Sequence, residues 1–352
     1  MTKNVKKINV AIQGGGAHGA FAWGVLDRLL DEDDIEIEAI TATSAGSMNA
    51  VIFAEGLRQN GRIGAKHYLE SFWFDISQAG VFYSPLKRAL QSSKPLKNKD
   101  LDWSPLYRFF QSVIRHFSPY QFNPANFNPL RSIIEKSVDF EKLALSSPIK
   151  LFLSATNVRS GKVRVFSTEH LSSDVVLASS CLPFLFQAVK IEGEYFWDGG
   201  YMGNPALFPL FYHTDARDIL VVHINPIERH KIPQRASEIR NRINEISFNS
   251  SLLKEYRAIA FVLKLLEEDW LKPDYRNRLK HPLMHSIRTD DLMCDLSVVS
   301  KFDTSWTFLT SLKERGRQAA DSWLEKHKDS LGIKGTIDLH SEFLGLGSQH
   351  TG

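Results

Sequence analysis

Ser44 is the residue whose surroundings predict chemistry most directly. It lies in Ala42-Thr43-Ser44-Ala45-Gly46, after an apolar stretch at 35–40 that reads as a strand and before a helix-like segment at 47–52. A serine on such a sharp strand-to-helix turn needs a strained backbone, which small neighbours such as Ala42 and Gly46 permit. The turn exposes the serine hydroxyl in front of a helix N-terminus. The sequence therefore predicts a nucleophilic serine at position 44.

A glycine-rich loop near the start of the chain is suited to the negative charge that such a serine creates. Residues 8–13 read as a buried strand, and Gly14, Gly15 and Gly16 follow directly, before His18 and Gly19. Consecutive glycines leave backbone N–H groups unshielded, and such groups beside a helix N-terminus can form an oxyanion hole. We expect this loop to lie between a core strand and a core helix.

A base for the serine is predicted at Asp198. This residue lies between Trp197 and the pair Gly199-Gly200, after a strand-like segment at 189–191. A glycine turn can bring the carboxylate close to a second loop, where it accepts the serine proton. An isolated Asp-Gly-Gly sequence is usually a surface turn, but its occurrence with the other two motifs favours a catalytic role. The segment 178–184, a helix end stopped by proline, returns the chain toward this turn.

Taken together, these motifs resemble those of bacterial patatin-like phospholipases over about residues 7–226, and the sequences at 154–157 and 204–205 fit the same pattern. The resemblance implies a three-layer α/β/α fold with a mostly parallel central sheet. It implies a lipid acyl hydrolase of the phospholipase A or lysophospholipase A type that uses no cofactor and no metal. It also implies the roles: Ser44 is acylated by a phospholipid or lysophospholipid, Asp198 activates the serine and then water, and the backbone of Gly14, Gly15 and Gly16 holds the oxyanion.

Two positions depart from the pattern of this family. Ala42 stands where the serine turn of the family begins with glycine, so we expect a local adjustment of the backbone there. His18 stands where the glycine loop of the family usually carries arginine or lysine, so a positive charge at this position depends on protonation near neutral pH. We expect His18 to assist an anion or to make an ordinary polar contact, not to act as the base.

Length and composition fit one α/β domain with an appended helical region. The chain has 352 residues, 43% of them hydrophobic, and a net charge of +3, which is too small to argue for nucleic acid. Cys181 and Cys294 lie in different motifs without metal-binding spacing. We find no signal peptide and no apolar run of about 20 residues. We therefore expect a cytoplasmic protein that meets membranes only at their surface.

The chain divides by its patterns into three parts. Residues 1–228 form the predicted catalytic domain, in which the buried strand at 218–226 is expected to be the last of the sheet. Residues 229–331 read as a helical extension, similar to one in some bacterial patatin-like proteins. Residues 332–352 are expected to be loosely ordered. The extension could serve as a dimer face or as a lid, and the sequence does not decide between them. A homo-oligomer is compatible with the sequence as well.

A segment at 80–128 interleaves aromatic and basic side chains. This composition suits the headgroup boundary of an anionic membrane, and equally a lid over the core. Single-stranded nucleic acid is a distant third reading. The candidate membrane or lid residues are Lys94, Lys97, Lys99, Trp103, Phe109 and Phe110.

Other functions compete with the lipid hydrolase. The glycine loop also fits a dinucleotide-binding oxidoreductase, but its second strand ends at Ser44 and not at the acidic residue that would hold a ribose. A serine–histidine–aspartate hydrolase needs a late histidine in a glycine-flanked loop, which His170, His213 and His223 do not provide. A catalytically weak membrane-binding protein would keep the fold, and a hydrolase of storage polyesters would keep the same two catalytic residues.

Overall fold

The computed structural model describes residues 5–83, 116–229, 231–268, 270–272, 274, 279–294, 296 and 298–343. The segment 84–115 lies outside these ranges, and with it lie Lys94, Lys97, Lys99, Trp103, Phe109 and Phe110. The interpretation of these residues as a membrane-docking segment or lid stays a prediction.

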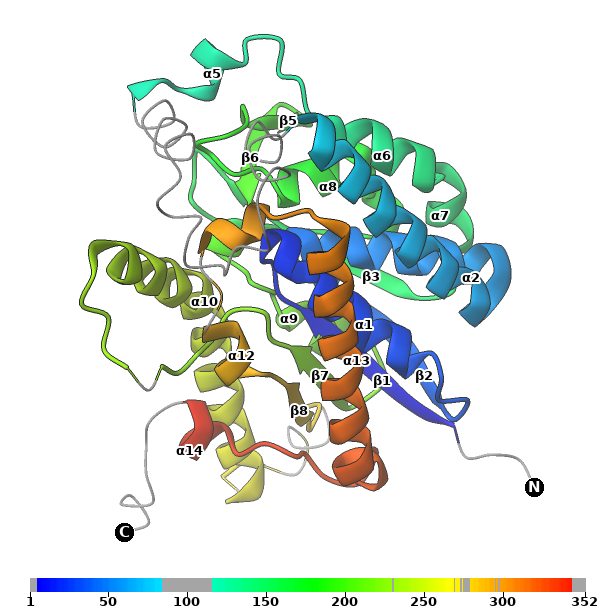
Figure 1. Ribbon diagram of the computed structural model, residues 1–352. Coiled ribbons are helices and arrows are strands. Elements are labelled where there is room, and N and C mark those ends of the chain that lie inside the picture. The colour runs from blue at the N-terminus through cyan, green and yellow to red at the C-terminus, as the bar shows by residue number, and fades with distance from the viewer. Residues whose placement is uncertain are drawn as a thin grey trace.

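An eight-stranded sheet forms the middle layer of the fold (Figure 1). Its order is β5-β6-β3-β2-β1-β7-β8, and β4 pairs with β3 beside this path. The pairs β1–β2, β1–β7, β2–β3 and β7–β8 are parallel, whereas β3–β4, β3–β6 and β5–β6 are antiparallel. The strands are β1 (Lys6–Ile12), β2 (Ile35–Ala42), β3 (Lys150–Asn157), β4 (Val163–Ser167), β5 (Val189–Ile191), β6 (Glu194–Asp198), β7 (Asp218–Val222) and β8 (Leu283–Ile287).

Helices cover both faces of this sheet. One face packs against α1 (Ala20–Leu29), α2 (Ala45–Tyr83), α6 (Pro129–Ser137), α7 (Phe140–Ser146), α8 (Ser173–Ser179) and α13 (Trp306–His327). The other face packs against α9 (Phe208–His213), α10 (Ala236–Glu267) and α14 (Leu339–Phe343). The remaining short helices are η1 (Gly16–Gly19), α5 (Pro119–Phe122), η3 (Thr168–His170), η4 (Gly199–Tyr201), α12 (Asp290–Cys294), η5 (Val298–Phe302) and η6 (Lys328–Ser330). The predicted three-layer fold with a mostly parallel sheet is confirmed.

The central strands are buried on both faces because helices cover both. All five residues of β7 and the last five of β1 are buried, as expected for parallel strands between two helical layers. The helix α2 includes a break, since Asn60 and Gly61 have non-helical backbone angles.

The predicted helical extension is part of the same core. Helices α1 and α13 lie side by side on one face of the sheet (Figure 1), and their backbones touch. A Cβ atom on Gly24 would overlap the carbonyl oxygen of Lys313, and one on Gly316 would overlap that of Phe21. Glycine at both positions therefore permits the close approach of the two helices.

The carboxyl-terminal part differs from the sequence analysis in two respects. The strand at β7 is not the last of the sheet, because β8 pairs with it in parallel. The described part of the expected loose tail, up to Phe343, packs on the core, since Leu339 and Phe343 are buried with Tyr256. Both corrections have the same cause: these residues cover the β7 edge and one face of the sheet, which would otherwise meet water.

None of the described helices is both long and apolar enough to cross a membrane.

Candidate active site

Ser44 lies directly after β2, where the chain turns into α2. Its φ angle is 55°, in the left-handed region that non-glycine residues rarely adopt. Its backbone N–H donates to Ser179 Oγ (3.0 Å), which also shares a hydrogen bond with Ser47 Oγ (2.8 Å). The predicted strained turn is therefore present, and α8 supports it through Ser179.

The glycine loop meets this turn because β1 and β2 are parallel neighbours. Ile12 and Ala42 are paired at their ends, so the segments that follow lie together. A Cβ atom on Gly14 would lie 2.6 Å from the Cβ of Ser44. Only glycine allows the loop to approach the serine this closely.

The loop does not offer all three of its predicted N–H groups. Gly14 N–H donates to Asn204 Oδ1 (2.7 Å), so it is not free to bind an oxyanion. Within the described part of the chain, the N–H groups of Gly15 and Gly16 donate no hydrogen bond. Gly16 is exposed, whereas Gly15 is buried. The expected oxyanion donors therefore reduce to Gly15 and Gly16.

Asp198 lies at the end of β6, opposite Ala155 of β3. Its N–H donates to Cys181 O (2.8 Å), and its carbonyl accepts from Thr156 Oγ1 (2.8 Å). The strand-end position and these two contacts fix the backbone from which the carboxylate projects. The expected return of segment 178–184 toward this turn is thus seen in the contact with Cys181.

The Asp198 carboxylate is fully buried and only partly hydrogen-bonded. Oδ1 accepts from Gly200 N–H (2.7 Å), and Oδ2 has no well-formed hydrogen bond among the described residues. Burial raises the pKa of Asp198 to about 6, against the opposing effects of the Gly200 N–H, the neighbouring Ser44 hydroxyl and the charge of Lys301. At neutral pH the carboxylate is mostly ionised, with an oxygen available to the serine.

His18 is held as a neutral side chain. It is buried, and Nε2 shares a hydrogen bond with Ser300 Oγ (2.7 Å). Burial, and next the charge of Lys301, lower the pKa of His18 to about 3. His18 is therefore not protonated near neutral pH. The positive charge that the sequence analysis made conditional on this protonation is absent.

Lys301 brings a positive charge to the site from the carboxyl-terminal part of the chain. Its Nζ donates to Asn225 Oδ1 (2.9 Å) and Asn244 Oδ1 (3.2 Å). Asn225 in turn donates from Nδ2 to the carbonyl of Gly14 (2.8 Å). Burial lowers the pKa of Lys301 to about 8, although Glu245 and Asp198 oppose the shift. The glycine loop itself carries His18 and no arginine or lysine, but the ammonium of Lys301 lies beside the loop.

The supporting residues predicted from the sequence lie where the glycine loop, the serine turn and the aspartate turn approach neighbouring segments. Ala42 is fully buried at the end of β2, and its methyl group is part of the hydrophobic core that β2 shares with α1 and α2. Gly19 approaches Ala45, and Gly46 approaches the carbonyl of Ile12. Gly199 lies against the carbonyl of Ser154 and Gly200 against the ring of Phe248.

The histidines considered for a triad lie elsewhere. His223 is buried and shares a hydrogen bond with the Tyr256 hydroxyl (3.2 Å), and burial lowers its pKa to about 3. His170 is exposed, and His213 stacks on Phe152. Among the described residues, no three histidine, cysteine, aspartate or glutamate side chains are grouped so that they could hold a metal ion.

Several residues of the site were not identified from the sequence. Gln13 accepts from Ile224 N–H (2.9 Å) and donates to Asn249 (3.0 Å), which joins β1 to α10. Asn204 fixes Gly14, and Ser179 fixes Ser44. The sequence signal for Asn204 was its place in the Asn-Pro pair of the family pattern. Lys301 had no such signal, because no motif surrounds it.

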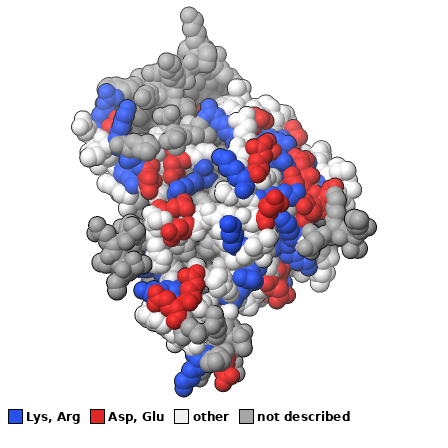
Figure 2. Space-filling view, turned by 90° about the horizontal axis from the view of Figure 1, so that it is seen from below, with Lys and Arg blue, Asp and Glu red and all other residues white. Residues whose placement is uncertain are grey.

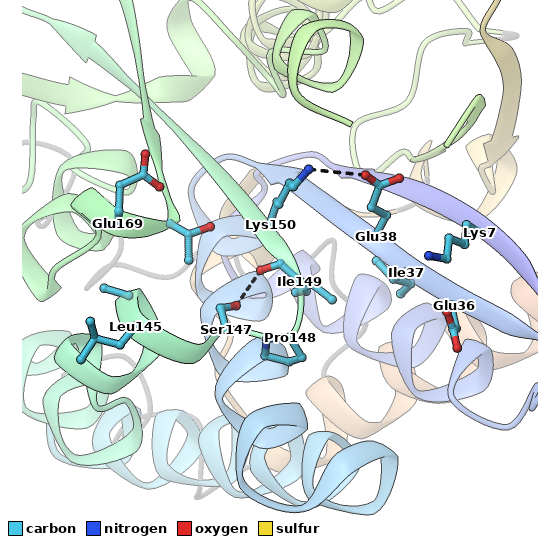
Figure 3. A pocket seen from close by; sticks show the side chains of 12 residues that line it. Lys7, Glu36, Ile37, Glu38, Leu145, Ser147, Pro148, Ile149, Lys150 and Glu169 are labelled. Atoms are coloured by element: carbon cyan, nitrogen blue, oxygen red, sulfur yellow. Dashed lines mark hydrogen bonds and ion pairs between the residues drawn. The ribbon is translucent and has the colours of Figure 1, made fainter. Parts of the chain in front are cut away.

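One groove on the surface lies away from this site. It has a volume of about 430 Å³ and is lined by residues from the beginnings of β1, β2 and β3 (Figure 3). Lys150 and Glu38 form an ion pair across it (3.6 Å). Because Ser44 follows the opposite end of β2, the groove lies at the other edge of the sheet and contains none of the predicted site residues.

Comparison with known proteins identifies the family. The model of the patatin-like phospholipase family matches residues 10–211, more than half of the chain. This protein therefore belongs to the patatin-like phospholipase family, which places it among the lipid hydrolases. The family predicted from the sequence motifs is confirmed.

Solved structures with a related arrangement are distant in sequence. The crystal structure of VipD from Legionella pneumophila has 15% identity and a TM-score of 0.41, over 96% of this chain and 73% of that chain. ExoU in its complex with SpcU, from the type III secretion system of Pseudomonas aeruginosa, has 16% identity and a TM-score of 0.35. That match covers 92% of this chain and 52% of the other, so this chain spans about half the length of that relative. Among curated protein sequences, none matches this one.

Proposed function

We propose that this protein cleaves acyl esters of phospholipids or lysophospholipids, with Ser44 as nucleophile and Asp198 as general base. One observation carries the proposal: a serine with a left-handed backbone and a buried carboxylate, from distant parts of the sequence, meet beside a loop in which two N–H groups donate no hydrogen bond to any described residue. Strained backbone and buried, incompletely paired polar groups are typical of catalytic sites.

The proposed reaction needs no further side chain for proton transfer. Asp198 takes the Ser44 hydroxyl proton as Oγ bonds to the ester carbonyl carbon, and the N–H groups of Gly15 and Gly16 donate to the resulting oxyanion. The carbon–oxygen bond to the glycerol then breaks, and the leaving oxygen takes the proton from Asp198. A water molecule then reacts in the same way. Asp198 accepts a proton from the water as its oxygen bonds to the acyl carbon, the bond between this carbon and Ser44 Oγ breaks to release the fatty acid, and Ser44 Oγ takes the proton back from Asp198.

The direct test is hydrolysis by single variants. Ser44→Ala removes the nucleophile, and Asp198→Asn keeps the shape of the side chain but cannot accept the proton. We expect each to reduce kcat on a lysophospholipid by about 10⁴-fold or more, with an unchanged circular dichroism spectrum. Substantial turnover by Asp198→Asn would show that another group acts as the base.

We also propose that the amino-terminal half of α10 contacts the lipid surface. Ile239, Ile243 and Ile246 are 43%, 59% and 53% exposed, and their spacing places them on one stripe of the helix. The exposed side chains of Arg235 and Arg240 lie on the same turns and favour an anionic surface. On the face shown in Figure 2, acidic and basic side chains are interspersed without a continuous patch of either sign, so we do not propose docking there.

Vesicle sedimentation tests this surface. Replacing Ile239, Ile243 and Ile246 by asparagine should weaken binding to phosphatidylglycerol vesicles at least tenfold, since each buried isoleucine contributes about 1.5–3 kcal/mol. Ile63→Asn, at an exposed isoleucine of α2, is the control. Unchanged binding of the triple variant would contradict the proposal. Loss of binding on neutralising Lys94, Lys97 and Lys99 instead would assign docking to the 80–128 segment.

A further inference from the structure

Lys301 occupies a position that connects the carboxyl-terminal part of the chain to the glycine loop. Its carbonyl oxygen lies 2.6 Å from the place where a Cβ atom of Gly16 would be, so η5 packs directly against the loop. Its ammonium reaches Gly14 through a single side chain, Asn225. It also lies 5.3 Å from the ring of Phe248, which touches Gly200 of the aspartate turn. The ammonium therefore lies between the two loops that carry the proposed chemistry.

Among the described residues no carboxylate forms an ion pair with this ammonium, although the charges of Glu245 and Asp198 act on it from further away. Both groups that accept from Nζ are amide oxygens. The nearby carboxylate of Glu245 forms ion pairs with Arg229 (2.5 Å) and Arg242 (3.3 Å). Lys301 is partly buried, and an ammonium withdrawn from water is costly without an opposite charge. It has a third N–H to donate, and burial already lowers its pKa. These features suit an ammonium that receives an anion from a ligand.

We propose that Lys301 binds the phosphate of a glycerophospholipid substrate and so selects phosphate-bearing lipids over uncharged esters. The inference rests on the proposed function, because it places the cleaved ester at Ser44 and the glycine loop. In a glycerophospholipid the phosphate is a fixed negative charge on the same glycerol unit as the ester, so with the ester at the glycine loop this charge is held close to a cation beside the loop. Lysine binds phosphate as a point charge, and the two asparagines hold its ammonium in place.

The test compares two substrates that share one acyl chain, lysophosphatidylglycerol and the matching monoacylglycerol. For Lys301→Gln we expect kcat/KM to fall about tenfold to hundredfold on lysophosphatidylglycerol, the usual effect of one hydrogen bond to a charged group. On the monoacylglycerol we expect a clearly smaller loss, because there Lys301 acts only through Asp198 and through Asn225 at the glycine loop. Lys301→Arg should retain most of the preference. Lys326→Gln removes an exposed lysine at the far end of α13 and should change neither rate.

A second variant keeps the lysine and neutralises it. Asn244→Asp places a carboxylate against the ammonium, at the position of an amide oxygen that now accepts from it. It should produce the same selective loss, and it tests the proposal if Lys301→Gln does not fold. The preference of the wild-type protein for lysophosphatidylglycerol in kcat/KM should also fall above about pH 8, as the ammonium loses its proton.

The outcomes separate this proposal from the proposed function. An equal loss on both substrates would overturn it, because Lys301 would then act on the oxyanion or on Asp198. No loss on either substrate would overturn it as well. If the wild-type protein hydrolyses neither substrate, the proposed function itself is rejected.

Discussion

The two edges of the central sheet contrast sharply in how they hold polar groups. At the carboxyl-terminal ends of β1 and β2, Ser44 has a strained backbone, and Asp198 is fully buried, with one oxygen that has no well-formed hydrogen bond among the described residues. At the amino-terminal ends, the groove of Figure 3 holds an ion pair between Glu38 and the half-exposed Lys150. A hollow alone therefore does not mark the site. What distinguishes the proposed site is that a strained serine and an incompletely paired buried carboxylate occur together, at the edge where open parallel sheets bind ligands.

Gly14→Ala should break this contrast most severely. The added methyl group would lie 2.6 Å from Ser44 Cβ and 3.1 Å from the carbonyl of Thr43, so the loop or the serine must move. We expect at least a hundredfold loss of kcat, since a displacement of about 1 Å has that effect, and a loss of about 1–3 kcal/mol in the free energy of unfolding. Lysophospholipid hydrolysis and urea unfolding measure the two effects.

The matched control lies at the other edge of the sheet. Lys150 is half-exposed, and its ion pair with Glu38 is longer than a hydrogen bond. Lys150→Gln should leave kcat unchanged and alter the free energy of unfolding by less than about 1 kcal/mol. If Gly14→Ala had the same kcat as Lys150→Gln, the proposed functional difference between the two edges of the sheet would be contradicted.

The free energy of unfolding of Asp198→Asn tests whether the buried carboxylate at this edge of the sheet destabilises the fold. Burial raises the folded-state pKa of Asp198 to about 6, above its ordinary value of 3.8, so the folded protein binds this proton more tightly than the unfolded chain. Ionisation therefore destabilises the fold as the pH rises from about 4 through 6. At pH 7.5 we expect the asparagine variant to be more stable than the wild type, by up to about 3 kcal/mol. The difference should vanish below about pH 4.

Urea unfolding at pH 7.5 and pH 4 checks the sign of this effect. A correctly folded Asp198→Asn variant that is less stable than the wild type at pH 7.5 would show that the carboxylate stabilises the fold. The same pKa predicts that wild-type kcat/KM falls as the pH drops below about 6, because the base becomes protonated.

Local sequence patterns predicted much of the fold, and they also supplied the two residues that we propose as nucleophile and base. The buried runs that became β1 and β2, and the turns around Ser44 and Asp198, are each contained in a few consecutive residues. The patterns could not show which loop amides are already used. That Gly14 donates to Asn204 depends on a side chain from a distant segment.

The elements that sequence reasoning missed are polar or short. The strand β8 contains His285 and Ser286, so it does not read as a buried strand. The imidazole of His285 is nevertheless buried because Asp218 (2.9 Å) and Thr336 (3.0 Å) are its hydrogen-bond partners. Lys301 likewise has no local pattern, since its neighbours in space, Asn225 and Asn244, belong to other segments.

The central claim is that Ser44 is an activated nucleophile. The most direct measurement is the intact mass of the protein after exposure to a fluorophosphonate probe, for the wild type and for Ser44→Ala. The account predicts one covalent adduct on the wild-type chain and none on the variant. An unlabelled wild-type protein with its fold intact, or an adduct that persists in Ser44→Ala, would contradict it.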